Sequence, residues 1–392
     1  MSEMRPINEG EKEALAALFS NAYRIGHLEA MGWTAGLPPE ETIAVFEQDR
    51  IASFIRMARY TVMVGGREMN MGGVGGVATW ADLQGRGFAG SLMRESLRIM
   101  RERGDSVSAL YPFSHRYYGK FGWASMGTRI LYKGVAQQNI TPFKERSMVR
   151  RCTGIEDIER IDDVYRNYAA RYNGLVIRDR GNWEKRINAI GEKSDEIYLV
   201  KQEGNATGYF ICENVKQQQG EYENIVREFA CNTPAAFRAM FGFLAALPTN
   251  VKKITLAAPA FPPLAEYFKE PFIDMKWSLP IQYRVVDLER ALAKRGFDPD
   301  AKGCVVIAVN DDTAVWNTDT WEIEVGEGRA QARRTNEAAA VEMDIRGFSS
   351  LYMGHTAPLS LWRQGRLNCT KDTARLLQSL FHDNPVYLLD AF

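Results

Sequence analysis

The stretch QGRGFA at residues 84–89 has the residue types best suited to hold a charged ligand. It follows a β-rich segment and leads directly into a run with helical spacing. Glycine lets the backbone come close to a ligand, and the start of a helix leaves N–H groups without intrahelical acceptors at the positive end of the helix dipole. The pattern therefore predicts a pyrophosphate-binding turn. The motif alone leaves an ordinary glycine-rich turn open as the alternative.

Two other nucleotide-binding patterns do not fit this turn. A dinucleotide-binding fold requires G-x-G-x-x-G in a parallel unit, with an acidic residue about 20 positions further on. Here the glycines are spaced differently and a predicted hairpin precedes them. The lysine of a Walker A loop is also missing, so ATP is disfavoured.

The elements before the turn belong to a first α+β unit. Helical spacing predicts a helix over residues 11–22, and two glutamates at the start of residues 40–54 predict a second helix there. Residues 53–64 and 69–80 are β-rich and are separated by two glycines. They predict a hairpin whose second strand leads to the turn.

After the turn, the pattern predicts a helix, a strand over residues 106–111 and a tight aromatic turn over residues 117–124. Residues 133–151 lose periodicity and predict a linker. From residue 152 a second unit repeats the order of the first, but NTPAA at residues 232–236 replaces its glycine turn. A third, different unit begins near residue 285. The predicted boundaries are therefore 1–150, 151–283 and 284–392.

Composition limits the function classes. The 392 residues carry 49 basic and 49 acidic side chains, which argues against a long charged footprint for nucleic acid or a membrane surface. No stretch reaches the ~18 apolar residues of a spanning helix, and we expect a cytoplasmic protein. Five cysteines and four histidines are scattered without metal-ligand spacing, so we expect reduced thiols and no metal.

The turn and its flanks resemble the GNAT N-acetyltransferases, and the whole chain resembles the Eis family among them. The resemblance implies an α+β fold, in which tandem GNAT (acyl-CoA N-acyltransferase) mixed-sheet domains, the second degenerate, precede a sterol-carrier-protein-like α/β domain. It implies acetyl-CoA as co-substrate and direct transfer of acetyl in a ternary complex to a primary amine, such as an aminoglycoside, a polyamine or a lysine-like group. It also implies a homo-oligomer, a trimer or hexamer.

The same resemblance assigns the residues that hold acetyl-CoA. On the strand they are Val77, Ala78 and Thr79. In the turn they are Gln84, Gly85, Arg86, Gly87, Phe88, Ala89 and Gly90. Phe113 and Ser114 match a further cofactor contact, although the local sequence PFSHR departs from the family pattern there.

Tyr118 matches the general acid of the family. It lies in YGKFGW, which resembles the family's YGRFGY segment with Lys120 and Trp123 as departures. A phenol with a reference pKa of about 10 can protonate the thiolate that leaves when an amine attacks a thioester. The alternative is a tyrosine that packs in an aromatic cluster with Tyr117, Phe121 and Trp123.

The chain ends in VYLLDAF, and in the Eis family the terminal carboxylate reaches the active site. The resemblance assigns to Phe392 the role of a base for the amine proton, or of a group that orients the cation. A frayed terminus is the alternative. Glu29, Trp33 and Glu40 match a region that lines the family's substrate pocket, or are ordinary surface residues.

A binding protein is the second function that the sequence leaves open. In that case the acetyl-CoA site is vestigial and the C-terminal domain carries an apolar ligand or lipid. Fold resemblance alone does not decide between carriage and catalysis.

Overall fold

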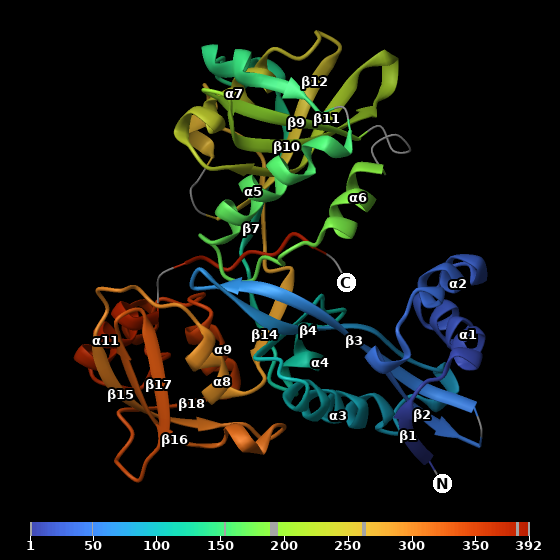
Figure 1. Cartoon of the computed structure of the whole chain (residues 1–392), viewed down its shortest axis with the longest axis vertical. Helices are drawn as coiled ribbons and strands as arrows, with labels where there is room; N and C mark the ends of the chain where they lie inside the picture. The colour runs from blue at the N-terminus through green and yellow to red at the C-terminus, as the bar shows by residue number, and fades with distance from the viewer. Residues whose placement is uncertain are drawn as a thin grey trace.

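The computed structural model describes residues 2–48, 50–152, 154–188, 195–260, 264–381 and 384–390. Within these residues the chain forms three β-sheets, each with its own helices (Figure 1). The units lie side by side, and the C-terminal segment, drawn in red, passes between the first and the second.

The first sheet has the strand order β1-β2-β3-β4-β5-β14-β6. Its strands are β1 (Ser2–Pro6), β2 (Thr42–Glu47), β3 (Arg50–Val64), β4 (Arg67–Thr79), β5 (Val107–Leu110), β6 (Ala124–Met126) and β14 (Ile281–Val285). Its helices are α1 (Lys12–Tyr23), α2 (His27–Ala35), α3 (Phe88–Glu102) and α4 (His115–Gly119). Helix α3 packs on β2, β3 and β4, whereas α1 packs on α2 and on β3 and β4.

The helix predicted over residues 40–54 is wrong, because this segment is β2 and the start of β3. Ile43 and Val45 belong to the core under α3, whereas Ala44 and Phe46 belong to the core under α1 and α2. A strand that is buried on both faces has an almost continuous apolar run, which does not show the period of two. The second N-terminal helix is α2 instead.

The predicted hairpin of β3 and β4 is confirmed. Gly65 and Gly66 form its turn with φ of 58° and 73°, the left-handed values that a two-residue hairpin turn requires. An added Cβ on Gly65 would lie 1.9 Å from the carbonyl oxygen of Gly296 in the third unit. This glycine therefore also allows two units to touch.

The second sheet has the order β13-β7-β12-β11-β10-β9-β8. Its strands are β7 (Arg129–Ala136), β8 (Val149–Arg151), β9 (Asp195–Gln202), β10 (Asn205–Lys216), β11 (Tyr222–Cys231), β12 (Val251–Pro259) and β13 (Met275–Ser278). Its helices are α5 (Ile158–Ala169), α6 (Arg180–Asn188) and α7 (Pro234–Ala245). The linker predicted over residues 133–151 is partly wrong, because β7 runs into it and buries Tyr132 and Val135 in the second core.

The third sheet has the order β17-β16-β15-β18. Its strands are β15 (Gly303–Asn310), β16 (Asp319–Gly326), β17 (Arg329–Arg334) and β18 (Val341–Asp344). Its helices are α8 (Leu288–Lys294), α9 (Ile345–Tyr352), α10 (Pro358–Arg363) and α11 (Lys371–Phe381).

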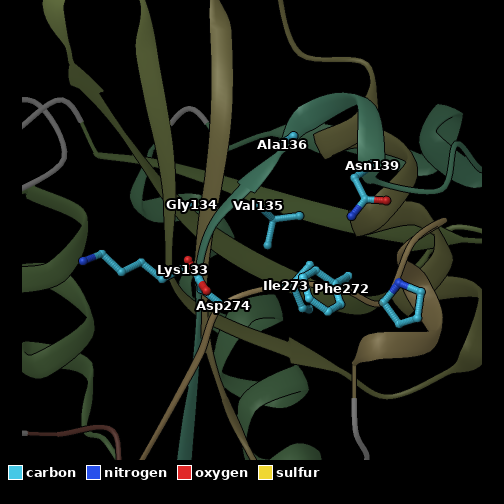
Figure 2. A pocket seen from close by; sticks show the side chains of 9 residues that line it. Lys133, Gly134, Val135, Ala136, Asn139, Phe272, Ile273 and Asp274 are labelled. Atoms are coloured by element: carbon cyan, nitrogen blue, oxygen red, sulfur yellow. The ribbon is translucent and has the colours of Figure 1, made fainter.

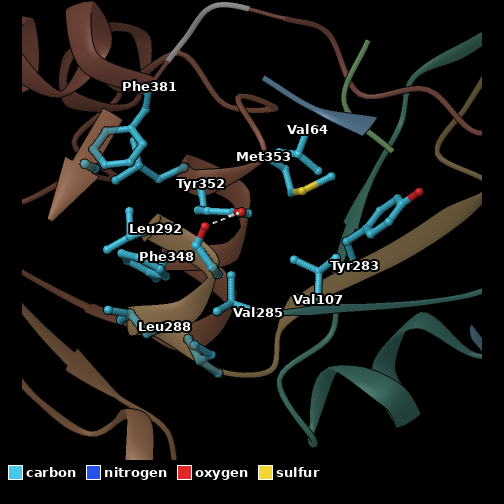
Figure 3. Close-up of a cluster of buried hydrophobic side chains, with 14 of the residues drawn as sticks. Val64, Val107, Tyr283, Val285, Leu288, Leu292, Phe348, Tyr352, Met353 and Phe381 are labelled. Carbon is cyan, nitrogen blue, oxygen red and sulfur yellow. Dashed lines mark hydrogen bonds between the residues drawn. The ribbon is translucent and has the colours of Figure 1, made fainter. Parts of the chain in front are cut away.

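The first and third units share one hydrophobic core. Val64, Val107 and Val285 of the first sheet belong to the same buried cluster as Leu292 and Phe348 of the third unit (Figure 3). The hydroxyl of Tyr352 donates to the carbonyl of Ala291 at 2.9 Å within this cluster. Side chains therefore fill the space between the third unit's helices and the first sheet.

The chain passes from the first sheet to the second at β7 and returns to the first sheet at β14. β7 follows β6 of the first sheet but pairs with β12 and β13 of the second, whereas β14 follows β13 of the second sheet but pairs with β5 and β6. Sheet membership therefore does not follow the chain linearly, and the boundaries at 150 and 284 stay predictions. No helix in the described part of the chain is long and apolar enough to cross a membrane.

Candidate active site

The start of α3 carries the N–H groups expected of an anion site. Gly85 and Gly87 have φ of 80° and 84°, and Gly87 is the N-cap of the helix. Because glycine has no side chain to cap the helix and Ser91 makes the first bond, to the Gly87 carbonyl at 3.0 Å, the N–H groups at residues 88–90 have no intrahelical acceptor. An added Cβ on either glycine would meet no atom within 4 Å. The turn thus leaves open space in front of these donors.

A β-bulge in β4 lies just before this turn. Arg56 of β3 pairs with Gly75 and Phe54 pairs with Ala78, so β4 carries one extra residue there. Gly76 sits in the bulge with φ of 61°. On its other side β4 pairs with β5 only from Met71 to Val74 in the described residues. Val77, Ala78 and Thr79 therefore lie beyond that parallel pairing, although Ala78 and Thr79 still pair with β3 on the other side.

Two predicted cofactor residues make bonds of their own. The Arg86 guanidinium pairs with the Glu47 carboxylate of β2 at 3.0 Å. The hydroxyls of Thr79 and Ser53 are 2.7 Å apart, and the Ser53 hydroxyl also donates to the Ala78 carbonyl at 2.8 Å. These contacts fix the turn and the strand before it. Gln84, the first residue of the predicted motif, is exposed.

Tyr118 lies on the short helix α4, where an aromatic turn had been predicted. The residue is 4% exposed. Burial raises the pKa of its phenol well above 10, and the neighbouring Tyr23 and Tyr117 raise it further. Tyr118 is therefore a protonated group at neutral pH, which suits a proton donor and not a base.

Both interpretations of Tyr118 have support in its surroundings. The rings of Phe113 and Tyr117 each lie 5.2 Å from the Tyr118 ring in edge-on geometry, so the residue does belong to an aromatic cluster. The Phe113 side chain itself is 73% exposed. The Ser114 hydroxyl caps α4 by accepting from the Tyr117 N–H at 3.2 Å. Ser114 thus has a structural role that positions the tyrosine.

The fold brings the main predicted features together. Tyr118 is part of the buried cluster against which Val77 and Phe88 pack. An added Cβ on Gly90 would lie 3.5 Å from the ring of Phe121, and that ring is 5.5 Å from Tyr117. The bulged strand, the start of α3 and the tyrosine helix therefore surround one core.

Phe392, the predicted terminal carboxylate, lies outside the described residues. The described chain reaches Asp390, whose carbonyl accepts from the Tyr111 hydroxyl at 3.2 Å. Tyr111 directly follows β5 and precedes Phe113 by two residues. The C-terminal segment therefore meets the segment that carries Tyr118.

Sequence reasoning missed the group that holds this segment. The Asp390 carboxylate pairs with Arg178 at 3.0 Å and with Arg186 at 2.6 Å, and both arginines also pair with Glu228. Separations of 212 and 204 residues give no local signal. An acidic residue in an otherwise apolar tail was the only hint.

The remaining candidates are placed as follows. The Trp33 ring stacks on Phe19 at 4.0 Å and lies against Gly76, next to the bulge. Glu29 and Glu40 are exposed. His115, which lies on the same short helix as Tyr118, has its Nδ1 2.6 Å from the Ser125 hydroxyl and borders a cavity next to the third unit.

Two cavities in the described residues lie away from the glycine turn. One of about 920 Å³ is bordered by His115 and Ser125 of the first unit and by Arg346 and Leu361 of the third. Another of about 470 Å³ lies between β7 and residues 271–274 in the second unit (Figure 2). Neither contains a predicted cofactor residue. No group of three potential metal ligands occurs in the described residues.

Family models match most of the chain. Residues 3–126 and residues 174–285 each match an acetyltransferase (GNAT) domain, and residues 288–389 match a sterol carrier protein domain. These matches correspond to the first sheet with its glycine turn, to the second unit and to the third unit.

Two relatives align along nearly the whole length. An uncharacterized N-acetyltransferase of Streptomyces griseus is 23% identical over 371 residues, which cover 85% of this chain and 87% of the relative. The N-acetyltransferase Eis of Mycobacterium tuberculosis is 22% identical over 373 residues, which cover 90% and 89%.

Solved structures share the complete fold. A GCN5-related N-acetyltransferase from Anabaena variabilis superposes with a TM-score of 0.89 at 18% identity, and Eis1 from Mycobacterium abscessus with 0.81 at 20%. Both alignments cover 100% of each chain. The predicted fold class is confirmed, and so is the resemblance: the chain has two acetyltransferase (GNAT) domains followed by a sterol carrier protein domain, and it is similar along its length to the Eis-like GNAT N-acetyltransferases.

Proposed function

We propose that this protein transfers acetyl from acetyl-CoA directly to a primary amine in a ternary complex. The amine nitrogen attacks the thioester carbonyl, the C–N bond forms, the C–S bond breaks and the sulfur leaves as thiolate. Tyr118 gives its proton to the sulfur, and a base takes a proton from the attacking nitrogen. One observation carries the proposal: Tyr118 belongs to the buried cluster against which Val77 of β4 and Phe88 at the start of α3 pack.

The residues present fit acetyl-CoA, which membership in the GNAT family implies as co-substrate. The N–H groups at residues 88–90 and the open space at Gly85 and Gly87 suit the pyrophosphate. The strand segment from Val77 to Thr79 lies beyond the pairing with β5, so its backbone suits the pantetheine arm. An N–H there would polarise the thioester carbonyl.

Tyr118 is the proposed general acid. Its burial keeps the phenol protonated, so the proton is held until negative charge develops on the sulfur. Cys152 and Cys231 are poor nucleophiles for covalent catalysis, because burial raises the pKa of each thiol to about 12.

The Phe392 carboxylate is the proposed base or orienting group for the amine. Support comes from the anchored segment before it, in which Asp390 meets Tyr111 near the Tyr118 helix. An ordinary α-carboxyl is ionised at neutral pH and is a weak base. Orientation of the cationic amine therefore demands less of this group than proton abstraction does.

The acceptor is proposed to be an aminoglycoside, a polyamine or a lysine-like amine. Aromatic rings of α1 and α2 support a cationic acceptor, because Phe19, Tyr23 and Trp33 gather next to the bulge and to Tyr118. Aromatic faces attract ammonium groups by about 0.5–2 kcal/mol each. Assembly as a trimer or hexamer is proposed on the family resemblance, as are the boundaries at 150 and 284.

Two measurements test this function. Calorimetry should show micromolar binding of acetyl-CoA to the full chain, and a thiol-release assay should show turnover with a member of the amine panel. Absence of both acetyl-CoA binding and turnover across aminoglycosides, polyamines and lysine peptides would refute the proposal.

An apolar-ligand carrier is the second candidate, favoured by the cavity of about 920 Å³ beside the third unit. Its lining is mixed, however, with His115 and Arg346 among the polar groups. The interior between the third unit's sheet and helices is filled with side chains. Lipid that co-purifies with the protein in stoichiometric amount, without acetyl-CoA binding, would support the carrier instead.

A further inference from the structure

The charged cluster around Asp390 joins the C-terminal tail (residues 384–390) to the second GNAT unit. Arg178 lies between α5 and α6, Arg186 lies on α6 and Glu228 lies on β11. The side chains of Arg178 and Glu228 are 1% and 4% exposed. Two guanidinium groups and two carboxylates balance each other in charge, so the cluster is neutral only when the tail contributes Asp390.

The geometry of the cluster is that of a clamp. Arg178 binds Glu228 through Nη1 and Nη2 at 2.6 and 2.9 Å, and it binds Asp390 through Nε and Nη2 at 3.0 Å each. Its guanidinium also lies over the rings of Tyr165 and Trp183, at 4.2 and 4.7 Å from their centroids. These contacts with the second unit hold the arginine independently of the tail, and a pre-oriented guanidinium loses little entropy when a carboxylate binds.

Asn173 forms a second attachment for the same tail. Its side-chain amide donates to the carbonyls of Asn384 and Met353 at 3.1 and 3.0 Å and accepts from the Gly65 N–H at 2.7 Å. Its backbone accepts from Tyr387 at 3.0 Å. One buried asparagine therefore links the tail to the first and third units.

The tail also contacts the segment that leads from β5 to the Tyr118 helix. Beyond the clamp, the Asp390 carbonyl accepts from Tyr111, which follows β5 and lies two residues before Phe113. The Phe113 ring contacts the Tyr118 ring at 5.2 Å. The contact of Asp390 with Tyr111 therefore links the tail to the segment that carries Tyr118, the proposed general acid.

We propose that Arg178 and Arg186 of the second GNAT unit are positioning residues for the reaction, because they seat Asp390 and so hold the terminal carboxylate in the active site. This inference rests on the proposed role of Phe392. It gives the second unit, which lacks the glycine turn, a function in catalysis by the first. The arginines act through the tail and touch no reacting atom.

The test compares the full chain with Asp390→Asn, with Asp390→Glu and with a deletion of Phe392. In Asp390→Asn the side chain that pairs with Arg178 and Arg186 loses its charge, so carboxypeptidase A should release Phe392 at least 10-fold faster than from the wild type. The kcat for acetyl transfer should fall at least 10-fold, while the Kd for acetyl-CoA stays within 2-fold. Asp390→Glu should restore part of the kcat.

Glu184→Gln is the matched control, because Glu184 pairs with Arg180 on the same helix α6 but on the surface. It should change neither the kcat nor the release of Phe392. If Asp390→Asn does not fold, Arg186→Gln serves in its place, since Arg186 is 32% exposed and its loss leaves Arg178 to neutralise Glu228.

The outcomes separate the two hypotheses. Loss of kcat on deletion of Phe392, with wild-type kcat and release rate in Asp390→Asn, would overturn the clamp and leave the proposed function intact. Wild-type kcat after deletion of Phe392 would overturn the role of the terminal carboxylate, and the positioning role with it.

Discussion

The indole ring of Trp33 lies directly against the backbone of Gly76. An added Cβ on Gly76 would come within 2.5 Å of Cη2 of that ring and within 3.1 Å of the Phe54 ring. The contact places the aromatic face of α2 against the bulge of β4, so one glycine connects the proposed acceptor side with the proposed cofactor strand.

Replacement of Gly76 by alanine should therefore damage both stability and acetyl-CoA binding. A left-handed φ of 61° costs alanine about 1–2 kcal/mol, and the contact with Trp33 adds to this. We expect a lower Tm and at least 10-fold weaker acetyl-CoA binding by calorimetry. Gly36→Ala is the control, because Gly36 has φ of −86° and no atom within 4 Å of its Cβ position. Equal affinity in Gly76→Ala and wild type would contradict a role for the bulge.

The turn before α3 gives a second prediction. Gly87→Ala should raise the KM for acetyl-CoA with little effect on kcat, since the added methyl group enters the space in front of the helix N–H groups. Gly365→Ala carries the same backbone strain, with φ of 69° and an open Cβ position, but lies in the third unit. The two variants should lose similar stability, about 1 kcal/mol. The same KM in both would argue for an ordinary turn.

Tyr118→Phe should lower the kcat by about 10²- to 10⁴-fold, the range typical of a lost general acid. The ring stays in place, so the fold and the acetyl-CoA affinity should be retained. Tyr117→Phe, on the adjacent residue, should keep most of the activity. A kcat for Tyr118→Phe within 3-fold of the wild type would leave the residue with packing alone.

The pH profile checks the same assignment. An acid catalyst fails when the pH rises through its pKa, and burial raises the pKa of Tyr118 above 10. Hence the kcat should not fall between pH 7 and pH 9 on account of this group. A loss of kcat in that range that disappears in Tyr118→Phe would show a lower pKa and contradict the buried phenol.

Glu228 makes stability depend on acid pH. Burial alone would raise its pKa, but Arg178, Arg186 and the Tyr209 hydroxyl at 2.5 Å lower the pKa to about 2. Because the folded pKa lies below the unfolded value, the stabilisation is complete above about pH 4.5 and is lost as the pH falls toward 2. Urea unfolding at pH 6, 4 and 3 should show this loss. Glu228→Gln should have a lower free energy of unfolding at pH 6, and this free energy should change less with pH than in the wild type. Parallel pH curves for the two proteins would rule the mechanism out.

Local patterns predicted local structure well. The β3–β4 hairpin, the glycine turn and α3 follow from glycine positions and from spacing within residues 50–102. The strand β2 was missed because buried residues on both of its faces hide the alternation and two glutamates imitate a helix start. Helix α4 is only five residues long, too short for a periodic signal.

Contacts between residues that are distant in the chain could not be predicted from the sequence. The bond between Arg178 and Asp390 and the pairing of Gln282 with Leu110 join residues far apart in the chain. Neither arginine nor glutamine carries a local mark of its partner, so only the folded chain reveals them. The family resemblance supplied Tyr118, but it gave no hint of the clamp behind the tail.

The return of β14 to the first sheet bears on how the protein is made. β6 enters the first sheet through β14, with Ala124 opposite Tyr283, so the ribosome must release more than 280 residues before the catalytic unit can close. Until then the nascent first unit exposes the edge of β5, a state prone to wrong pairing. Synthesis of either GNAT unit alone would leave a strand without its sheet, and the two therefore mature as one.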